Sequence, residues 1–90
     1  MKHLKTLQTI VELEKKHKVI FSANDVKVLL VLLSSLNNTY YNHIGNGYIS
    51  EVSNISAEDV RKIISNFITM EIIEYDLDPN TYALLYKLNI

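Results

Sequence analysis

Cysteine is absent from these 90 residues, so the chain can form neither a disulfide framework nor a thiolate metal site. Long apolar runs are absent too: the longest, residues 28–33, is far shorter than the roughly 20 residues that span a bilayer. The lysines near the N-terminus are not followed by the apolar stretch of a signal peptide. These absences predict a cytoplasmic protein that does not enter a membrane.

Groups arranged for catalysis or metal binding are also missing. His3, His17 and His43 show no ligand spacing with one another or with carboxylates, whereas a zinc site needs three or four convergent groups. The stretch "GNG" at 45–47 lacks the lysine and the sequence signature of the following helix that a phosphate-binding loop has. No serine has the setting of a nucleophile elbow. We therefore expect neither an enzyme nor a bound cofactor.

Positive charge is scarce in the second part of the chain. Residues 1–36 carry six lysines and three acidic residues, whereas residues 37–90 carry Arg61, Lys62 and Lys87 against seven acidic residues. A nucleic-acid binder concentrates basic charge on its binding face, because phosphate contacts supply most of its non-specific affinity. The lysines of the first part are therefore candidates for phosphate contacts that the second part lacks.

The length, with no linker-like run, predicts a single domain, and 48% apolar residues are typical of a globular one. Residues 1–18 are expected to form an amphipathic helix, with Leu4, Leu7 and Val11 on one face. Ile10 and Leu13 widen this stripe. It can pack on the chain's own domain, or Leu4, Leu7 and Val11 can form a dimer interface, and both alternatives stay open.

Residues 22–36 are predicted to form the central helix. Ser22 and Asp25 have the spacing of a capping box, and nearly every position from 26 to 36 is apolar. A helix that is apolar on almost all sides is expected to be buried.

The polar loop 37–47 follows the central helix. Its Tyr40, Tyr41 and His43 can stack on a base or ligand, or anchor the loop to the core.

Residues 48–69 are predicted to form two helices joined by a sharp turn. Asn54 falls at the turn, and asparagine is the best non-glycine residue for a left-handed conformation. In the first helix, Ile49 and Val52 are expected to point inward.

The second of these helices begins with Ser56 and Asp59, which repeat the capping-box spacing. Val60, Ile64 and Phe67 recur at helical spacing and are expected to face the core.

Residues 71–90 change to a strand-like pattern. "IIEYDLD" and "TYALLYKLNI" are rich in β-prone residues and flank "DPNT", which favours a tight turn. The fold class is therefore mainly α with a C-terminal β-hairpin, and "KVIF" or "GYI" is the candidate for a small third strand.

The segment "YISEVSNISAEDVRKIISNFITMEIIEY" resembles the helix-turn-helix and first wing strand of the winged helix-turn-helix superfamily. The resemblance covers residues 20–90, with 1–18 as an additional N-terminal helix. The layout is similar to small dimeric transcriptional regulators of the MarR (multiple-antibiotic-resistance) and staphylococcal accessory regulator type. It implies that the helix from Ser56 enters the major groove of double-stranded DNA.

The resemblance implies a set of DNA-contacting residues: Ser56, Glu58, Arg61, Lys62, Ser65, Asn66, Asn80 and Thr81. Arg61 is the main base-edge candidate because a guanidinium can donate two bonds to guanine, and Asn66 is a candidate for adenine. Ser56 and Ser65 can bond phosphates and Lys62 can neutralise one. The hairpin tip, with Asn80 and Thr81, would approach the DNA backbone or minor groove.

The chain departs from the family pattern at several acidic positions. Glu58 and Asp59 occupy the first turn of the reading helix, where carboxylates stabilise the helix N-terminus but repel phosphates. Glu58 can also accept from a cytosine amino group. The hairpin tip carries Asp76 and Asp78 instead of basic residues, and Glu71 replaces a common glycine, so that the helix is expected to end differently.

Two functions compete. The first is a DNA-binding protein, a small transcriptional regulator or a replication or partition accessory factor, acting as a homodimer. The alternative is a winged-helix module for protein–protein interaction, whose acidic hairpin and reading helix dock on a basic partner.

Overall fold

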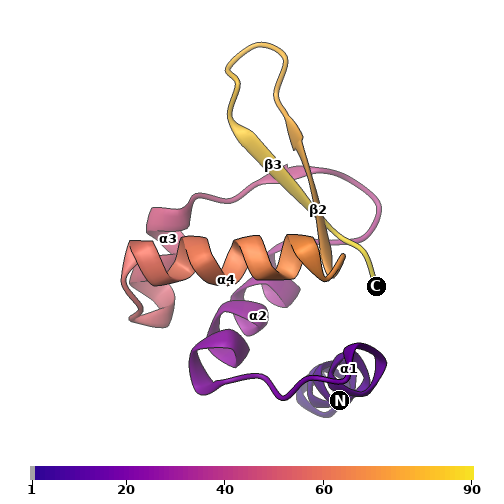
Figure 1. Cartoon of the computed structure of the whole chain (residues 1–90). Helices are drawn as coiled ribbons and strands as arrows, with labels where there is room; N and C mark the ends of the chain where they lie inside the picture. The colour runs from indigo at the N-terminus through magenta and orange to yellow at the C-terminus, as the bar shows by residue number, and fades with distance from the viewer. Residues whose placement is uncertain (1) are drawn as a thin grey trace.

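Four helices and three short strands are formed by residues 2–90, the part of the chain that the structure, a computed structural model, describes, with side chains from Lys5 onward. In chain order the elements are α1 (Lys2–His17), α2 (Ala23–Ser35), β1 (Asn42–His43), α3 (Asn46–Ser53), α4 (Ala57–Thr69), β2 (Ile73–Leu77) and β3 (Leu84–Leu88). Figure 1 shows α4 lying across α2, with α3 at one end and the β2–β3 hairpin extending away from the helices. The described residues thus form a mainly helical domain with a small antiparallel sheet.

The helices begin at the predicted caps. The Ser22 hydroxyl accepts from the Asp25 N–H at 3.1 Å, and the Asp25 carboxylate accepts from the Ser22 N–H at 3.0 Å, which confirms the first capping box. The Ser56 hydroxyl accepts from the Asp59 N–H at 3.2 Å, so the structure records one of the two bonds expected there. Each serine satisfies one of the amides that a helix start leaves without a partner.

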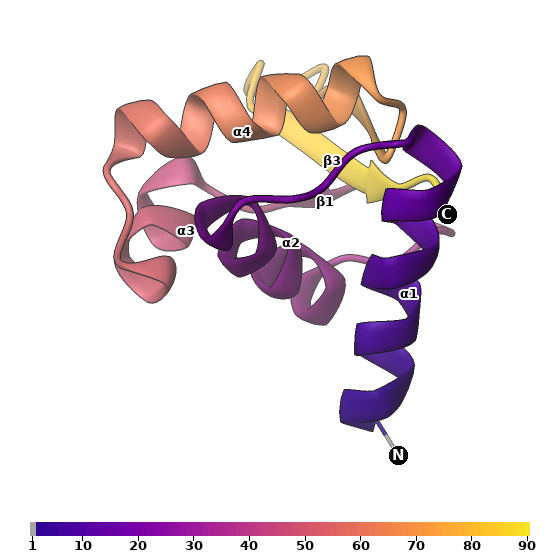
Figure 2. The same ribbon diagram turned by 60° about the horizontal axis from the view of Figure 1, so that its bottom comes forward.

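The core lies between α2, α3, α4 and the sheet, and α1 adds to it from one side (Figure 2). From α4, Phe67 is almost completely buried and meets Phe21 edge to face, with ring centroids 5.8 Å apart. From α1, Ile10 and Leu13 are buried. The part of the N-terminal stripe formed by these two residues therefore packs on the chain's own domain.

The sheet has the order β1-β3-β2, and both pairings are antiparallel. The hairpin is confirmed, but the third strand lies at Asn42–His43, which pairs with Tyr86 and Leu85. Both predicted positions are wrong: "KVIF" is an irregular link, and "GYI" belongs to α3. Two polar residues carry no β pattern of their own, so only their pairing with a distant segment makes them a strand.

The prediction that Val52 points inward is wrong, since its side chain is 55% exposed. The buried positions of α3 are Ile49 and Ser53, one helical turn apart. The hydroxyl of the buried Ser53 donates to the Ile49 carbonyl within the same helix.

The prediction that α2 is buried on almost all sides is also only partly correct. Val28, Leu29, Val31 and Leu32 are buried, but Leu30 is 43% exposed. Leu30 lies on the side of α2 that faces α1, and α1 does not cover it.

Helix α4 ends with a left-handed residue, at a position that is usually occupied by glycine. Glu71 is left-handed, with a φ of 62°, and the Ile72 N–H donates to the Phe67 carbonyl at 2.9 Å. This bond closes a glycine-type C-terminal cap. The expectation of a different helix end is therefore wrong: the usual conformation is kept, and Glu71 adopts it at some steric cost.

None of the described helices is both long and apolar enough to cross a membrane.

Candidate nucleic-acid interface

The turn between α3 and α4 sets the direction in which α4 leaves α3. Asn54 is left-handed, with φ 57° and ψ 44°, which confirms the expected turn. The Ser50 hydroxyl donates to the Ile55 carbonyl across the turn, and the Ile55 N–H donates to the Ser50 carbonyl at 3.2 Å. Ile55 is buried, so the turn is held to the core as well as to α3.

The buried face of α4 fixes the helix on the domain. Val60, Ile64 and Phe67 are buried, as predicted, and Ile63 is buried with them. Because these side chains are packed in the core, the opposite face of α4 is presented in a fixed orientation.

The exposed face of α4 carries the predicted reading residues and forms one shallow depression of about 400 Å³. It is lined by Glu58, Arg61, Lys62, Ser65 and Asn66. The structure thus brings five of the eight predicted DNA-contacting residues together on a single surface. All five belong to α4, so the depression is set by the helix alone.

The two basic side chains of this depression differ in their bonding. Lys62 Nζ lies 3.6 Å from Glu58 Oε1, one helical turn away, and both side chains are about 70% exposed. Such an exposed pair is weak in water. Among the described residues Arg61 makes neither a salt bridge nor a hydrogen bond, so its guanidinium is available to a ligand.

The predicted contacts Ser56, Asn80 and Thr81 lie elsewhere. Ser56 caps α4, with its oxygen accepting from the Asp59 amide. Asn80 and Thr81 lie in the hairpin loop, where Asp78 Oδ1 accepts from both of their amides, at 2.8 and 3.3 Å. None of the three lines the depression on α4.

The hairpin presents no unpaired cation. Its lysine, Lys87, lies 3.2 Å from Glu74, and its ammonium stands over the Tyr41 ring at 4.8 Å from the centroid. The Tyr41 hydroxyl also donates to Glu74 at 3.3 Å. Tyr41 therefore anchors its loop to the hairpin, whereas Tyr40 is 70% exposed.

The link between α1 and α2 was not predicted to belong to this region, yet it runs beside the C-terminal half of α4. Val19, Ile20 and Phe21 line one concave surface with residues of α4, Asn66 and Thr69 among them. Ile20 is 93% exposed. Its place in "KVIF" suggested a strand, and only the tertiary arrangement shows an exposed aliphatic residue beside α4.

Lysines cluster at the end of α1, next to this link. Lys15 and Lys16 lie in the last turn of α1, and Lys18 follows it in a left-handed conformation. All three are exposed. The chain thus carries a basic segment into the link that borders α4, while the hairpin tip remains acidic.

Of the predicted dimer contacts, Leu7 is 57% exposed and Val11 is 38% exposed. The side chain of Leu4 lies outside the described residues. Within residues 5–90, no group of three or more acidic or histidine side chains is arranged to hold a metal ion.

Burial raises the pKa of Tyr86, which lies in the middle of β3 opposite Tyr75, above the ordinary value of a tyrosine. This residue is 3% exposed and belongs to the core.

Comparison of the chain with models of known protein families, with curated proteins and with solved structures gives no match in any of the three.

Proposed function

We propose that this chain is a winged-helix DNA-binding protein that lays the exposed face of α4 in the major groove. It would act as a homodimer, as a small transcriptional regulator or a replication or partition accessory factor. The observation that carries the proposal is the set formed by Arg61, Ser65 and Asn66. It unites an unpaired guanidinium, a hydroxyl and an amide on one rigidly mounted helix face.

The donors of this face match those that read base edges and bond phosphates. A guanidinium can donate two bonds to guanine, and an amide can pair with adenine. Ser65 and Lys62 can bond phosphates that flank the groove. The Lys62–Glu58 pair is exposed, so Lys62 can exchange its partner for a phosphate at little cost.

In this proposal the lysines at the end of α1 contact the phosphates, in place of the basic residues that a wing often supplies. Lys87 is engaged with Glu74 and Tyr41, Asp76 lies in β2 near the hairpin tip, and Asp78 lies in the hairpin loop. The lysines at the end of α1 adjoin the link that borders α4. A second copy would double the number of such contacts.

A labelled DNA duplex of random sequence, titrated at low and at moderate salt, tests the proposal. We expect binding at low salt that weakens with salt, with a slope of about −0.9 per phosphate neutralised. Absence of binding even at low salt would reject the function.

A second candidate, docking of a basic protein segment, is favoured by one feature of the hairpin. Tyr75 and Leu77 lie on the same face of β2 and are about half exposed, and Asp76 lies between them in the strand. The Asp76 side chain alternates to the opposite face of the strand, so a basic partner with an apolar side would have to wrap the hairpin edge to meet both its apolar face and its carboxylate. Under this reading Leu77→Ser weakens partner binding and leaves DNA affinity unchanged.

A further inference from the structure

Ile20 is the most exposed large hydrophobic side chain of the described residues. It lies in the link between α1 and α2, and Figure 2 shows this link passing alongside α4. Single exposed aliphatic residues are common on protein surfaces and carry no meaning by themselves. Ile20 differs from such a residue in three respects: how firmly its segment is held, which surface it adjoins and which charges surround it.

Bonds on both sides of Ile20 hold the link in place. The Val19 N–H donates to the Glu14 carbonyl at 3.1 Å, and the Phe21 N–H donates to the Glu14 carboxylate at 2.8 Å. Phe21 is buried, and its ring packs edge to face on Phe67 of α4. The link is therefore anchored to α1 and to α4, and Ile20 projects to solvent from a fixed segment.

The surface around Ile20 is continuous with the exposed face of α4. Asn66 lines the depression that holds Arg61 and Lys62, and it also lines a second concave surface, of about 300 Å³, together with Ile20. Thr69, exposed one helical turn after Ser65, lines this second surface as well. A duplex that holds the exposed face of α4 in its major groove would therefore meet Ile20 beside the C-terminal half of the helix.

The charges around the link suit a polyanion. Lys15, Lys16 and Lys18 are exposed, and within the described residues none of them forms a salt bridge. The second concave surface includes one carboxylate, that of Asp25, which is held in the capping box of α2. A carboxylate at a helix N-terminus is offset by the positive end of the helix dipole. Lysines beside an exposed aliphatic residue thus offer DNA both a phosphate contact and an apolar contact.

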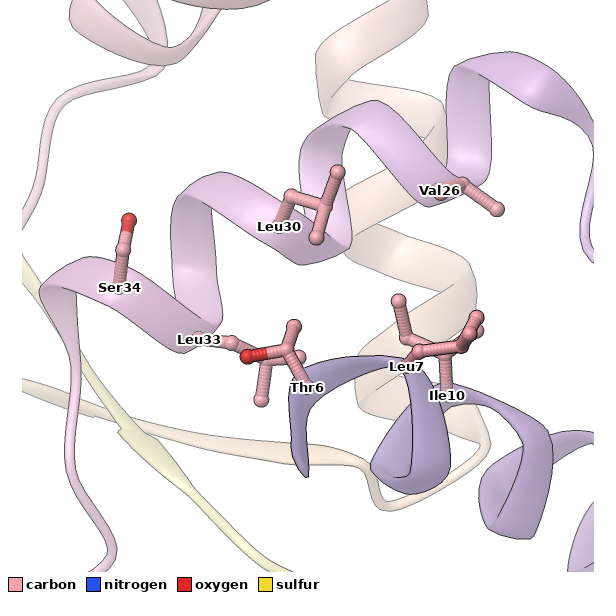
Figure 3. A pocket seen from close by; sticks show the side chains of 7 residues that line it. All are labelled: Thr6, Leu7, Ile10, Val26, Leu30, Leu33 and Ser34. Carbon is pink, nitrogen blue, oxygen red and sulfur yellow. The ribbon is translucent and has the colours of Figure 1, made fainter. Parts of the chain in front are cut away.

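The apolar groove between α1 and α2 lacks these properties. Figure 3 shows Leu7 and Ile10 of α1 facing Val26, Leu30 and Leu33 of α2. No charged residue and no residue of α4 lines this groove. The link is therefore the place where exposed apolar surface, unpaired lysines and the face of α4 come together.

We propose that Ile20 contacts the C5-methyl group of a thymine while Lys18 neutralises a neighbouring phosphate. The thymine methyl is the apolar group that base pairs present in the major groove, and aliphatic side chains recognise it by contact. The inference rests on the proposed function and deepens it, because it makes the link a second element that distinguishes base pairs. It assigns to Ile20 a preference for A·T pairs beside the position that Asn66 faces.

A duplex selected by the wild type from a random pool, and then remade with each thymine in turn replaced by uracil, tests the contact. Uracil lacks only the C5-methyl group. At one position we expect the wild type to bind the uracil duplex about 3- to 5-fold more weakly, the factor for one buried methyl group. Ile20→Ala should weaken binding to the thymine duplex by at least as much and should abolish the response to uracil at that position.

The phosphate contact is tested by Lys18→Gln, which keeps a side chain of similar length without the charge. We expect it to reduce the slope of log affinity against log salt by about 1. An unchanged slope overturns this part of the proposal.

The matched control is Ile90→Ala, which truncates an isoleucine that is 43% exposed near the C-terminus. It should respond to uracil as the wild type does. Because Ile20 is 93% exposed, we expect Ile20→Ala to unfold in urea like the wild type.

The outcomes separate this inference from the proposed function. A wild type that binds no duplex overturns both. A wild type that binds DNA, with the same response to uracil in Ile20→Ala, overturns the inference alone. Unchanged DNA affinity of Ile20→Ala, together with lost binding to vesicles of phosphatidylserine and phosphatidylcholine, also overturns it and assigns Ile20 to a lipid surface.

Discussion

Lys87 and Glu74 are direct cross-strand neighbours in the hairpin, and their charged atoms lie 3.2 Å apart. The Lys87 ammonium also stands over the Tyr41 ring, whose hydroxyl donates to the same carboxylate. The three side chains join the loop before α3 to the hairpin. This lysine is therefore used inside the fold, although in the sequence it is the most obvious cation for a wing that contacts DNA.

Replacing Lys87 by alanine is expected to leave DNA affinity unchanged, because its charge is already neutralised by Glu74. The side chains of Lys87 and Glu74 are 24% and 41% exposed, so solvent screening limits what this ion pair contributes to stability. We expect a loss of less than about 1 kcal/mol in the free energy of unfolding, including the contact with Tyr41. Urea unfolding and duplex titration of the same preparation measure both quantities. A large fall in affinity at constant stability would show that Lys87 contacts DNA.

Replacing Glu58 by glutamine is expected to change affinity and stability in opposite directions. The substitution removes a carboxylate that repels phosphate and frees Lys62 from its exposed ion pair, so DNA affinity should rise a few-fold. It also removes a negative charge from the first turn of α4, which should cost about 0.3–1 kcal/mol of stability.

The matched control for this substitution is Glu12→Gln, which removes an exposed carboxylate from the middle of α1. Titrations at one fixed salt concentration compare the two variants with the wild type. A decrease in affinity for Glu58→Gln alone would mean that Glu58 accepts from a base, as the cytosine contact requires.

Local sequence signals account for much of the fold. Ser22 with Asp25, and Ser56, cap helices where their spacing predicted, because a cap is a bond between residues three positions apart. Asn54 adopts the left-handed turn because its own side chain tolerates it. The face of α4 opposite Val60 is likewise exposed as periodicity predicted.

The failures have a common physical origin in contacts between distant segments. Asn42 becomes a strand residue only by pairing with Tyr86, more than forty positions later. Leu30 is exposed because α1 passes beside it without covering it, and Ile20 is exposed because the link leaves the core before Phe21 returns to it. No periodicity within one segment carries this information.

Glycine at position 71 is expected to stabilise the protein. Glu71 is left-handed, a conformation that costs an L-residue roughly 1–2 kcal/mol, whereas glycine loses about 0.5–1 kcal/mol more in chain entropy on folding. The difference gives a gain of about 0.5–1 kcal/mol for Glu71→Gly, measured by urea unfolding. Glu71→Ala keeps the Cβ atom and should show no such gain. Equal stabilisation by both substitutions would attribute the effect to the glutamate charge instead.

Stability should fall at high pH because of Tyr86. Its pKa is raised in the folded state by burial, so folding favours the neutral phenol. The resulting stability is fully present below the unfolded-state pKa of about 10 and is lost as pH rises through the folded-state pKa. Tyr86→Phe removes this titration, so its unfolding free energy should decline less between neutral and strongly alkaline pH. Identical pH profiles for the two proteins would contradict the assignment.

The most direct measurement of the central claim is the affinity of Arg61→Ala for a DNA duplex, compared with the wild type and with Lys87→Ala. Arg61 is exposed and unpaired within the described residues, so its loss should leave the free energy of unfolding within about 0.5 kcal/mol. Loss of a bidentate base contact costs about 1–3 kcal/mol, a roughly 5- to 150-fold weaker affinity for a duplex that contains the recognised sequence. We expect that weakening for Arg61→Ala and none for Lys87→Ala. If Arg61→Ala binds DNA as tightly as the wild type, α4 is not the helix that reads DNA.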